Sequence, residues 1–220
     1  MRKAGDAWTV EAWLTHWVEN IAAAHVRPNT LSAYRVAVNV HLIPGIGRHR
    51  LAKLEPEHLE KLYARMIANG SKPATAHQVH RTIRTALNEA QRRRHLVTIN
   101  PATIAKAPTL GDDEVEPYSV DEVKHLLVAA ADRRNAARWA VALALGLRQG
   151  EALGLKWTDV DLEAGLLTVR RARQRPRWKH GCDEPCGHPR AGDCPQRIAL
   201  RDDTADTKSP RRPPHRRAAG

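Results

Sequence analysis

Cysteine is scarce in this 220-residue chain, and its three cysteines all lie between Cys182 and Cys194. An odd number of closely spaced cysteines does not supply the even disulfide framework of small secreted proteins. Long apolar runs are also absent, since no stretch approaches the roughly 20 residues that a membrane-spanning helix needs. The charged start, residues 1–6, has no apolar segment after it and so does not look like a secretory signal. We therefore expect a cytoplasmic protein that does not enter the membrane.

Acidic residues are outnumbered in the chain. There are 24 Asp and Glu against 36 Lys and Arg, which gives a formal net charge of +12. This excess is larger than an average enzyme carries and is typical of a protein with a polyanionic partner. Nucleic acid is the first candidate for that partner, and a membrane surface is the second.

Apolar residues recur at helical spacing through the first hundred residues and predict four helices. Thr9 is placed to cap the first helix, and prolines open the other three, at Pro28, Pro56 and Pro73. The motif Pro44-Gly-Ile-Gly47 predicts a turn after the second helix. Four helices with short connections, each with one apolar face, predict a compact helical domain over residues 8–100.

The fourth helix also carries a polar stripe opposite its apolar face. Its members advance by four, three, four and three residues, and none is acidic: His77, Arg81, Arg84, Asn88 and Gln91. Arginine and histidine are suited to contact phosphates, and asparagine and glutamine can read adenine edges. The alternative is an ordinary solvated face, but surface helices usually intersperse acidic residues. We expect DNA contact along this stripe.

The second half of the chain has a different pattern. Residues 101–117 contain prolines, a glycine and an acidic run, which predict a linker. Ser119 and Glu122 then form a capping box, which marks the start of a second domain over residues 118–209. Residues 138–145 are nearly all apolar and predict a buried helix, and residues 166–169 predict a strand. The basic residues 210–220 predict a disordered tail. The expected fold is mainly α, with a helical domain followed by an incomplete α+β domain containing a short β-sheet or hairpin.

One arginine lies in an ordered motif within this second domain. The motif runs Gly146-Leu-Arg-x-x-Glu-x-Leu-x-Leu-x-Trp-x-Asp-Val-Asp161, and the arginine is Arg148. Leucines on both sides would hold its guanidinium in a fixed place, as a phosphate-binding group requires. An arginine that caps the carbonyls of the preceding helix is the alternative. The motif resembles the first-arginine box of the tyrosine recombinases, the phage integrase family. The phrase from Arg27 to Tyr34, Arg-Pro-Asn-Thr-Leu-Ser-Ala-Tyr, is also similar to that family.

The resemblance covers roughly residues 8–171 and has specific implications. It implies a SAM-like core-binding domain that grips double-stranded DNA, followed by a catalytic domain that acts without metal or cofactor and without a small-molecule substrate. In the family, a tyrosine hydroxyl attacks the scissile phosphate and forms a 3′-phosphotyrosyl link. Arg148 would bind the phosphate oxygens, Glu151 would orient its neighbours, and Lys208 would protonate the leaving oxygen. A solvated lysine is the alternative for Lys208. Other recombinase protomers on the DNA would be further partners.

Two parts of the family's active site have no match in these residues. His180, His188 and His215 are the histidines after Arg148, and none has an arginine three residues later. The three tyrosines, Tyr34, Tyr63 and Tyr118, all precede Arg148. We therefore expect a chain truncated before the second-arginine box and the tyrosine nucleophile, and unable to cleave DNA. The alternative is a non-enzymatic DNA-binding regulator, or a competitor of an intact integrase.

The cysteines form a last group of interest. Cys182, Cys186, His188 and Cys194 provide four ligands of the type that zinc prefers. Their spacing differs from the common Cys-x-x-Cys knuckle, and the family's active site needs no metal. A zinc staple in an inserted loop and reduced, unliganded cysteines are the two interpretations. We expect the second, with no metal bound.

Overall fold

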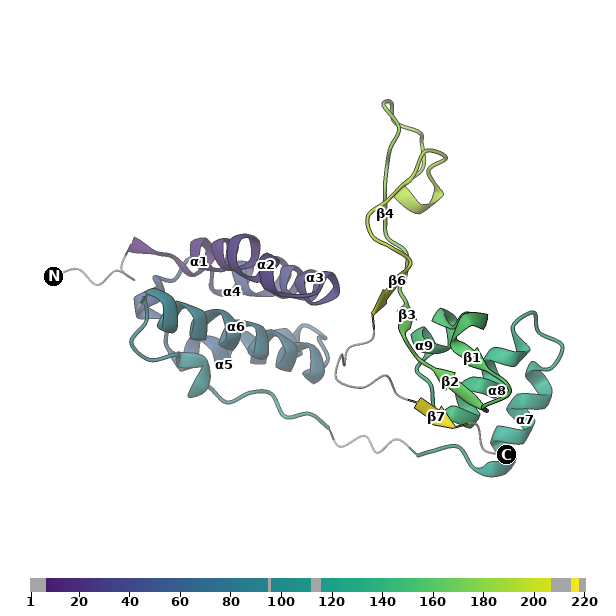
Figure 1. The fold of residues 1–220 in the computed structure, drawn as a ribbon. Coiled ribbons are helices and arrows are strands. Elements are labelled where there is room, and N and C mark those ends of the chain that lie inside the picture. The colour runs from purple at the N-terminus through teal and green to yellow at the C-terminus, as the bar shows by residue number, and fades with distance from the viewer. Residues whose placement is uncertain (1–6, 95, 112–115, 207–214, 218–220) are drawn as a thin grey trace. The chain divides into compact units, whose positions relative to one another are not determined.

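The computed structural model describes residues 7–94, 96–111, 116–206 and 215–217, and its arrangement is drawn in Figure 1. The chain divides into two compact units, Met1–Glu114 and Val115–Gly220. Each unit is described by itself below. The fold is mainly α with a few short antiparallel strand pairs, which confirms the predicted fold class. In the part of the chain that the structure describes, no helix is long and apolar enough to span a membrane.

The N-terminal unit is a helical bundle, and the four predicted helices are confirmed. The first two contain a π-helical stretch in the middle, whereas the third and fourth are regular. In chain order the segments are α1 (Val10–His16), a π-helical stretch (Trp17–Ala22), α2 (Ala23–His25), α3 (Pro28–Val36), a second π-helical stretch (Ala37–Leu42), α4 (Ile43–Ile46), a 3-10 turn (Leu51–Lys53), α5 (Pro56–Ala68), α6 (Pro73–Arg94) and a 3-10 turn (Pro101–Thr103).

Local capping explains where these helices begin. The Thr9 side chain accepts a hydrogen bond from the Ala12 amide at 3.1 Å, as the sequence predicts. Glu55 caps α5, and the His58 ring accepts a hydrogen bond from the Glu55 amide at 3.1 Å. The predicted turn at Pro44 is wrong, because residues 43–46 continue the second helix as α4. Pro44 comes directly after the π-helical stretch Ala37–Leu42, where the helix departs from the regular hydrogen-bond pattern, and Ile46 is buried in this last turn.

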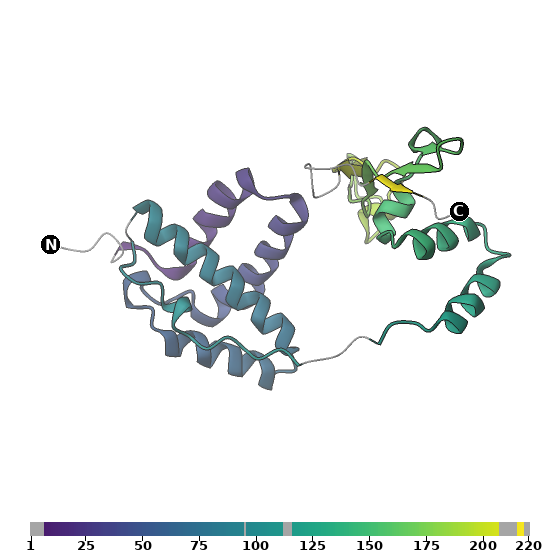
Figure 2. The same ribbon diagram turned by 60° about the horizontal axis from the view of Figure 1, so that its bottom comes forward.

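The core of the N-terminal unit lies between α6 and the other helices. Val79, Ile83, Leu87 and Ala90 of α6 are at most 1% exposed, which confirms its predicted apolar face. Trp13 of α1 is fully buried and donates its indole N–H to the Ala86 carbonyl at 3.0 Å. Figure 2 shows α6 crossing the helices of the first sixty residues. Full burial of a Val, Ile or Leu side chain, as at Val79, Ile83 and Leu87, stabilises the fold by about 1.5–3 kcal/mol.

The segment after α6 packs back onto the same core. Leu96, Val97, Ala102 and Ala105 are all buried in the N-terminal cluster. Asn100 fixes this return, since its side chain accepts from the Ala102 amide at 2.9 Å and donates to the Arg84 carbonyl at 3.0 Å. Residues 101–105 are thus part of the N-terminal unit, whereas the sequence predicts a linker from residue 101.

The described residues of the C-terminal unit form three α-helices and short antiparallel strands. The Ser119–Glu122 capping box is confirmed, and the predicted strand at 166–169 is confirmed as β2. The strands pair as β1–β2–β7, β3–β6 and β4–β5, all antiparallel. The elements are α7 (Val120–Ala130), α8 (Ala136–Leu145), α9 (Gln149–Gly154), a 3-10 turn (Trp157–Asp159), β1 (Val160–Asp161), β2 (Leu166–Thr168), β3 (Arg171–Arg173), β4 (Trp178–Lys179), a 3-10 turn (Ala191–Asp193), β5 (Ile198–Ala199), β6 (Thr204–Asp206) and β7 (His215–Arg217).

The prediction that the apolar helix α8 is buried is wrong. None of its residues is buried, and the Trp139 and Leu143 side chains are 39% and 36% exposed. Its neighbours α7 and α9 contact it, but its remaining surface has no cover among the residues that the structure describes. Apolar composition shows that a helix needs cover, and it does not show which segment provides it.

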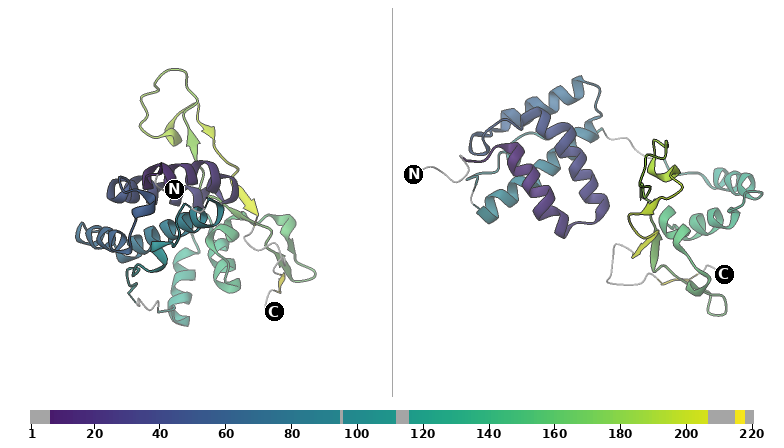
Figure 3. Two further views of the ribbon diagram at one scale, coloured as in Figure 1. Left: turned by 90° about the vertical axis from the view of Figure 1, so that its left-hand side faces the viewer. Right: turned by 90° about the horizontal axis from the view of Figure 1, so that it is seen from above.

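A long segment connects β3 to β6 within the C-terminal unit. We call this segment, residues 174–203, the hairpin arm. The pair β3–β6 forms its base, with Ala172 opposite Ala205, and the pair β4–β5 lies further out. Figures 1 and 3 show the arm standing away from the helices of its own unit.

Candidate functional site

Arg148 lies at the start of α9, directly after the end of α8. Gly146 ends α8 in the left-handed conformation, with φ of 60°, which glycine adopts without strain. The Arg148 guanidinium contacts the Glu151 carboxylate at 3.0 Å, and the Arg148 amide donates to the same carboxylate at 3.0 Å. The Arg148 side chain is 87% exposed and that of Glu151 is 16% exposed. The expectation that buried leucines clamp Arg148 is therefore wrong, and Glu151 orients it instead.

Helix α9 is itself held on the backbone of β3. A Cβ atom at Gly150 would lie 3.0 Å from the Arg173 carbonyl oxygen. One at Gly154 would lie 3.0 Å from both the Arg171 carbonyl oxygen and the Arg173 amide nitrogen. Two glycines one turn apart thus let the helix lie directly against the strand (Figure 1). This contact fixes the helix whose first turn carries Arg148.

A buried carboxylate secures the other side of β3. Asp159 accepts from the Lys156 amide at 3.0 Å and from the Arg171 guanidinium at 2.5 and 3.3 Å. The Asp159 side chain is 2% exposed and the Arg171 side chain 21% exposed. Arg170 adds a longer contact to the same carboxylate, at 3.6 Å. Sequence reasoning treated Asp159 only as the acidic end of a motif and missed this ion pair, because its partner lies 12 residues away in a strand.

The predicted stripe on α6 separates into two groups. The Arg81 and Arg84 side chains are exposed, and neither makes an ion pair with any residue that the structure describes. Asn88 and Gln91 are engaged within the unit: the Asn88 oxygen accepts from Asn100 at 2.7 Å, and the Gln91 amide donates to the Thr98 carbonyl at 2.9 Å. Those two side chains hold the returning segment against α6. Arg81, Arg84 and Asn88 are the exposed members of the stripe, and two of these three are arginines.

The histidine of the stripe belongs to a partly buried pair. His77 is half-buried, and its ring lies 6.3 Å from that of His80. His80 is buried and shares a hydrogen bond of 3.1 Å with the Tyr63 hydroxyl. Burial, aided by the nearby His77 and Arg84, lowers the pKa of His80 from its ordinary value. Burial also raises the pKa of Tyr63.

The three tyrosines have local roles that differ from that of a nucleophile. Tyr63 is buried beside His80, and Tyr34 packs against Trp17 with ring centroids 4.9 Å apart. Tyr118 is 70% exposed, immediately before the α7 cap. The predicted Lys208 lies outside the described residues, as does most of the predicted tail 210–220.

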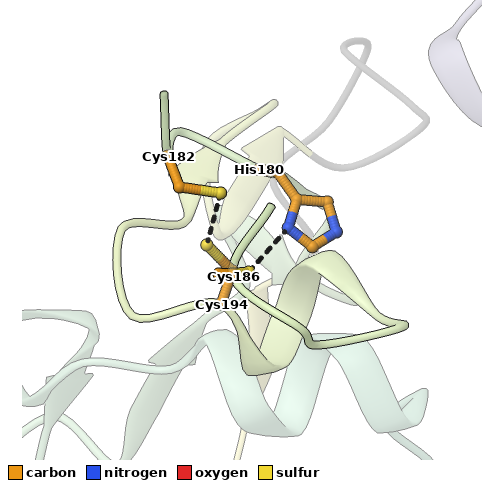
Figure 4. Close-up of side chains that lie close together, drawn as sticks. All are labelled: His180, Cys182, Cys186 and Cys194. Carbon is orange, nitrogen blue, oxygen red and sulfur yellow. Dashed lines mark hydrogen bonds between the residues drawn. The ribbon is translucent and has the colours of Figure 1, made fainter. Parts of the chain in front are cut away.

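The hairpin arm brings a histidine and all three cysteines together (Figure 4). The ligand atoms of His180, Cys182, Cys186 and Cys194 all lie within 4.8 Å of one another. The sequence-based set named His188, which is exposed and is not in this group. Burial raises the pKa of Cys182. Burial also acts to raise that of Cys194, but hydrogen bonds from the Gly181 backbone and the His180 side chain outweigh it and bring the pKa to about 6.

Sequence similarity to known proteins covers most of the chain. Residues 9–67 match the model of the family described as "Phage integrase, N-terminal SAM-like domain". An integrase of Saccharopolyspora erythraea is 52% identical over 191 residues, which cover 85% of this chain and 44% of that protein. A XerC-like tyrosine recombinase of Caldanaerobacter subterraneus subsp. tengcongensis is 30% identical over 128 residues, covering 56% of this chain and 32% of that protein.

Over these residues the chain is similar to integrases and tyrosine recombinases. Among solved structures, a lambda integrase dimer bound to a COC′ core site has a TM-score of 0.60 at 22% identity, covering 74% of this chain and 45% of that one. The Tn1549 transposon integrase in complex with circular intermediate DNA has a TM-score of 0.64 at 18% identity, covering 76% of this chain and 56% of that one. These likenesses support the recombinase fold. The chain spans less than half the length of the first of its curated relatives.

Proposed function

We propose that this chain carries the DNA-engaging part of a site-specific tyrosine recombinase, acting in the cytoplasm on double-stranded DNA. The observation that carries the proposal is the exposed pair Arg81 and Arg84 on one face of α6, in a chain with a net charge of +12. Two guanidiniums one turn apart are spaced to contact neighbouring phosphates of a duplex backbone. The DNA-bound states of the lambda and Tn1549 integrases support the same partner.

Arg148 would serve the chemistry of DNA strand exchange. The Arg148 guanidinium is exposed, and Glu151 contacts it through one nitrogen. Its other N–H groups can donate hydrogen bonds to a phosphate. In a complete recombinase such a group stabilises charge on the phosphorus while tyrosine forms the 3′-phosphotyrosyl link. Glu151 is a positioning residue in this proposal, since it contacts Arg148 and not the DNA. Lys208 remains the proposed proton donor to the leaving oxygen.

The residues of this chain support binding of DNA without cleavage. None of its tyrosines follows Arg148, and Tyr63 is buried and hydrogen-bonded. A nicked suicide duplex incubated with the protein should therefore yield no covalent adduct. Recovery of a phosphotyrosyl adduct on Tyr34, Tyr63 or Tyr118 would contradict this part of the proposal.

The test of the binding proposal is a duplex titration at several salt concentrations, by fluorescence anisotropy. The variant Arg81→Ala/Arg84→Ala removes two charges from the α6 face. The variant Lys53→Ala/Lys61→Ala removes two exposed charges elsewhere in the same unit. If each arginine neutralises one phosphate, the plot of log K against log salt should lose about 1.8 units of slope, which is about 60-fold in affinity at 0.1 M salt. Equal losses in the two variants would refute the assignment of the α6 face.

A non-enzymatic role in blocking an intact recombinase is a second candidate. The observation that favours it is the well-packed core of the N-terminal unit, which presents the α6 face on its own scaffold. Lambda integrase is seen as a dimer and as a tetramer on DNA, which makes other protomers plausible partners. Adding this chain to a recombination assay with a full-length relative tests this second role. A competitor lowers the yield of recombinants, whereas an inert chain leaves it unchanged.

A further inference from the structure

The four clustered side chains of the hairpin arm come from three separate points along it. His180 and Cys182 directly follow β4, Cys186 lies in the connecting loop, and Cys194 follows the 3-10 turn Ala191–Asp193. Their ligand atoms converge toward one point in Figure 4. The three cysteines are free thiols.

Two distances within the cluster are close to the edges of a metal-centred tetrahedron. Zinc binds sulfur at about 2.3 Å and imidazole nitrogen at about 2.0–2.1 Å, so tetrahedral ligands lie about 3.8 Å apart for two sulfurs and about 3.6 Å apart for sulfur and nitrogen. The Cys182 and Cys194 sulfurs are 3.8 Å apart, and the Cys186 sulfur is 3.4 Å from the His180 Nδ1. A disulfide would need two sulfurs at about 2.05 Å.

The hairpin arm has no hydrophobic core that would otherwise hold it. Cys194 is the one buried residue among residues 174–203, all of which the structure describes. Its large aliphatic side chains point outward, with Ile198 47% and Leu200 56% exposed. Thirty residues without buried apolar side chains cannot offset the conformational entropy of ordering them. Small folds of this kind are usually held by disulfides or a metal.

The backbone around Cys194 is arranged as in a ligand shell. Backbone groups of Gly181 and Gln196 hydrogen-bond to its sulfur. Gly181 must be glycine for this approach, since a Cβ atom there would collide with the Gln196 carbonyl oxygen. Hydrogen bonds of this kind, made to a ligand by groups that do not themselves bind the metal, hold the ligand in the orientation that metal binding requires.

We propose that His180, Cys182, Cys186 and Cys194 bind one structural Zn²⁺ that holds the hairpin arm together. Three thiolates and one imidazole are a preferred ligand set for this metal, and four protein ligands leave no open position for catalysis. The thiols release their protons to solvent when the metal binds, and no oxidation is involved. The interpretation with His188 is replaced by one with His180, and the expectation of unliganded cysteines is replaced by a metal site. This proposal does not depend on the DNA-binding function.

The first test is the metal content of the full chain, purified without chelator and under reducing conditions. Plasma mass spectrometry should find about one zinc per chain. Exchange with Co²⁺ should give the intense visible absorption of a tetrahedral thiolate site. Finding no zinc after supplementation, and no tetrahedral cobalt spectrum, would overturn the proposal. Formation of a Cys182–Cys194 disulfide in reducing buffer would overturn it as well.

A matched pair of histidine variants tests the ligand assignment. His180→Ala should weaken zinc binding by at least about tenfold in a competition titration with a chromogenic chelator, since it removes a direct ligand. His188→Ala removes an exposed histidine of the same arm and should keep the affinity of the native chain. Equal losses in both variants, or loss only in His188→Ala, would refute this ligand set.

Limited proteolysis provides a measurement that does not depend on any variant. The zinc-bound native chain should resist cleavage within residues 174–203, and chelation should expose that segment while the N-terminal unit stays intact. The N-terminal unit has its own apolar core and serves as the internal control. An arm that is cleaved at the same rate with and without zinc would contradict a structural role for the metal.

Discussion

The ion pair between Asp159 and Arg171 gives the sharpest test of how Arg148 is supported. Asp159→Asn keeps the shape of the side chain and an oxygen that can accept from the Lys156 amide. It removes the charge that faces the Arg171 guanidinium. Asp161→Asn is the matched control, because Asp161 is exposed and its oxygen accepts a hydrogen bond from the Ala164 amide, which asparagine can also do.

The expected magnitude follows from the burial of the two partners. Removing one partner of a fully buried pair costs about 3–5 kcal/mol, because the other charge is left without compensation. Arg171 is 21% exposed, and water can reach part of its guanidinium, which reduces this cost. We expect Asp159→Asn to destabilise the contact between α9 and β3 by about 2 kcal/mol, which is roughly a 30-fold change in an opening equilibrium. Asp161→Asn should change it by less than about 0.5 kcal/mol.

Amide hydrogen exchange read by mass spectrometry measures this opening directly. Peptides that cover residues 149–173 should exchange about 30-fold faster in Asp159→Asn than in the native chain. Peptides from α6 provide the internal control, since they lie in the other unit. Unchanged exchange in Asp159→Asn, or equal acceleration in Asp161→Asn, would refute the idea that the buried Asp159 carboxylate stabilises the packing of α9 on β3, which supports Arg148.

Two further predictions concern the packing of each unit. Burial holds the pKa of His80 below 6.5, so its protonation favours unfolding; the stabilising contribution is present above about pH 6.5 and is lost as the pH falls. Urea midpoints of the N-terminal unit should therefore drop more between pH 7.5 and 5.5 in the native chain than in His80→Gln, and a larger drop in the variant would contradict this. Gly154→Ala should lower the stability of the C-terminal unit by about 1–3 kcal/mol, because its Cβ meets the backbone of β3. Gly111→Ala, where a Cβ atom meets nothing within 4 Å, should be neutral in the same thermal melts, and equal shifts would contradict the packing of α9 on β3.

The sequence predicts the helices well where local signals agree with one another. Helix α6 has a proline at its start and apolar residues on a single face, and α7 has a Ser119–Glu122 capping box. The error at Pro44 has a local cause, because a proline next to glycines predicts a turn, whereas the helix continues through it directly after a π-helical stretch. The error at α8 has a tertiary cause, since composition alone does not reveal what covers a helix.

The candidate sites are only partly readable from the sequence. The spacing between Arg148 and Glu151 is that of a helix start, so their contact could have been predicted from it. The pairing of Asp159 with Arg171 depends on how a strand returns past α9, which no local pattern encodes. The choice of His180 over His188 likewise depends on the pairing of β4 with β5.

Position-specific crosslinking to DNA tests the central claim most directly. A photoreactive amino acid at position 85, an exposed site on α6 beside Arg81 and Arg84, should crosslink to a labelled duplex on irradiation. The same group at position 61, an exposed site on α5, should give little or no crosslink. Efficient crosslinking from position 61 with none from position 85 would contradict the account that this chain holds DNA against the α6 face.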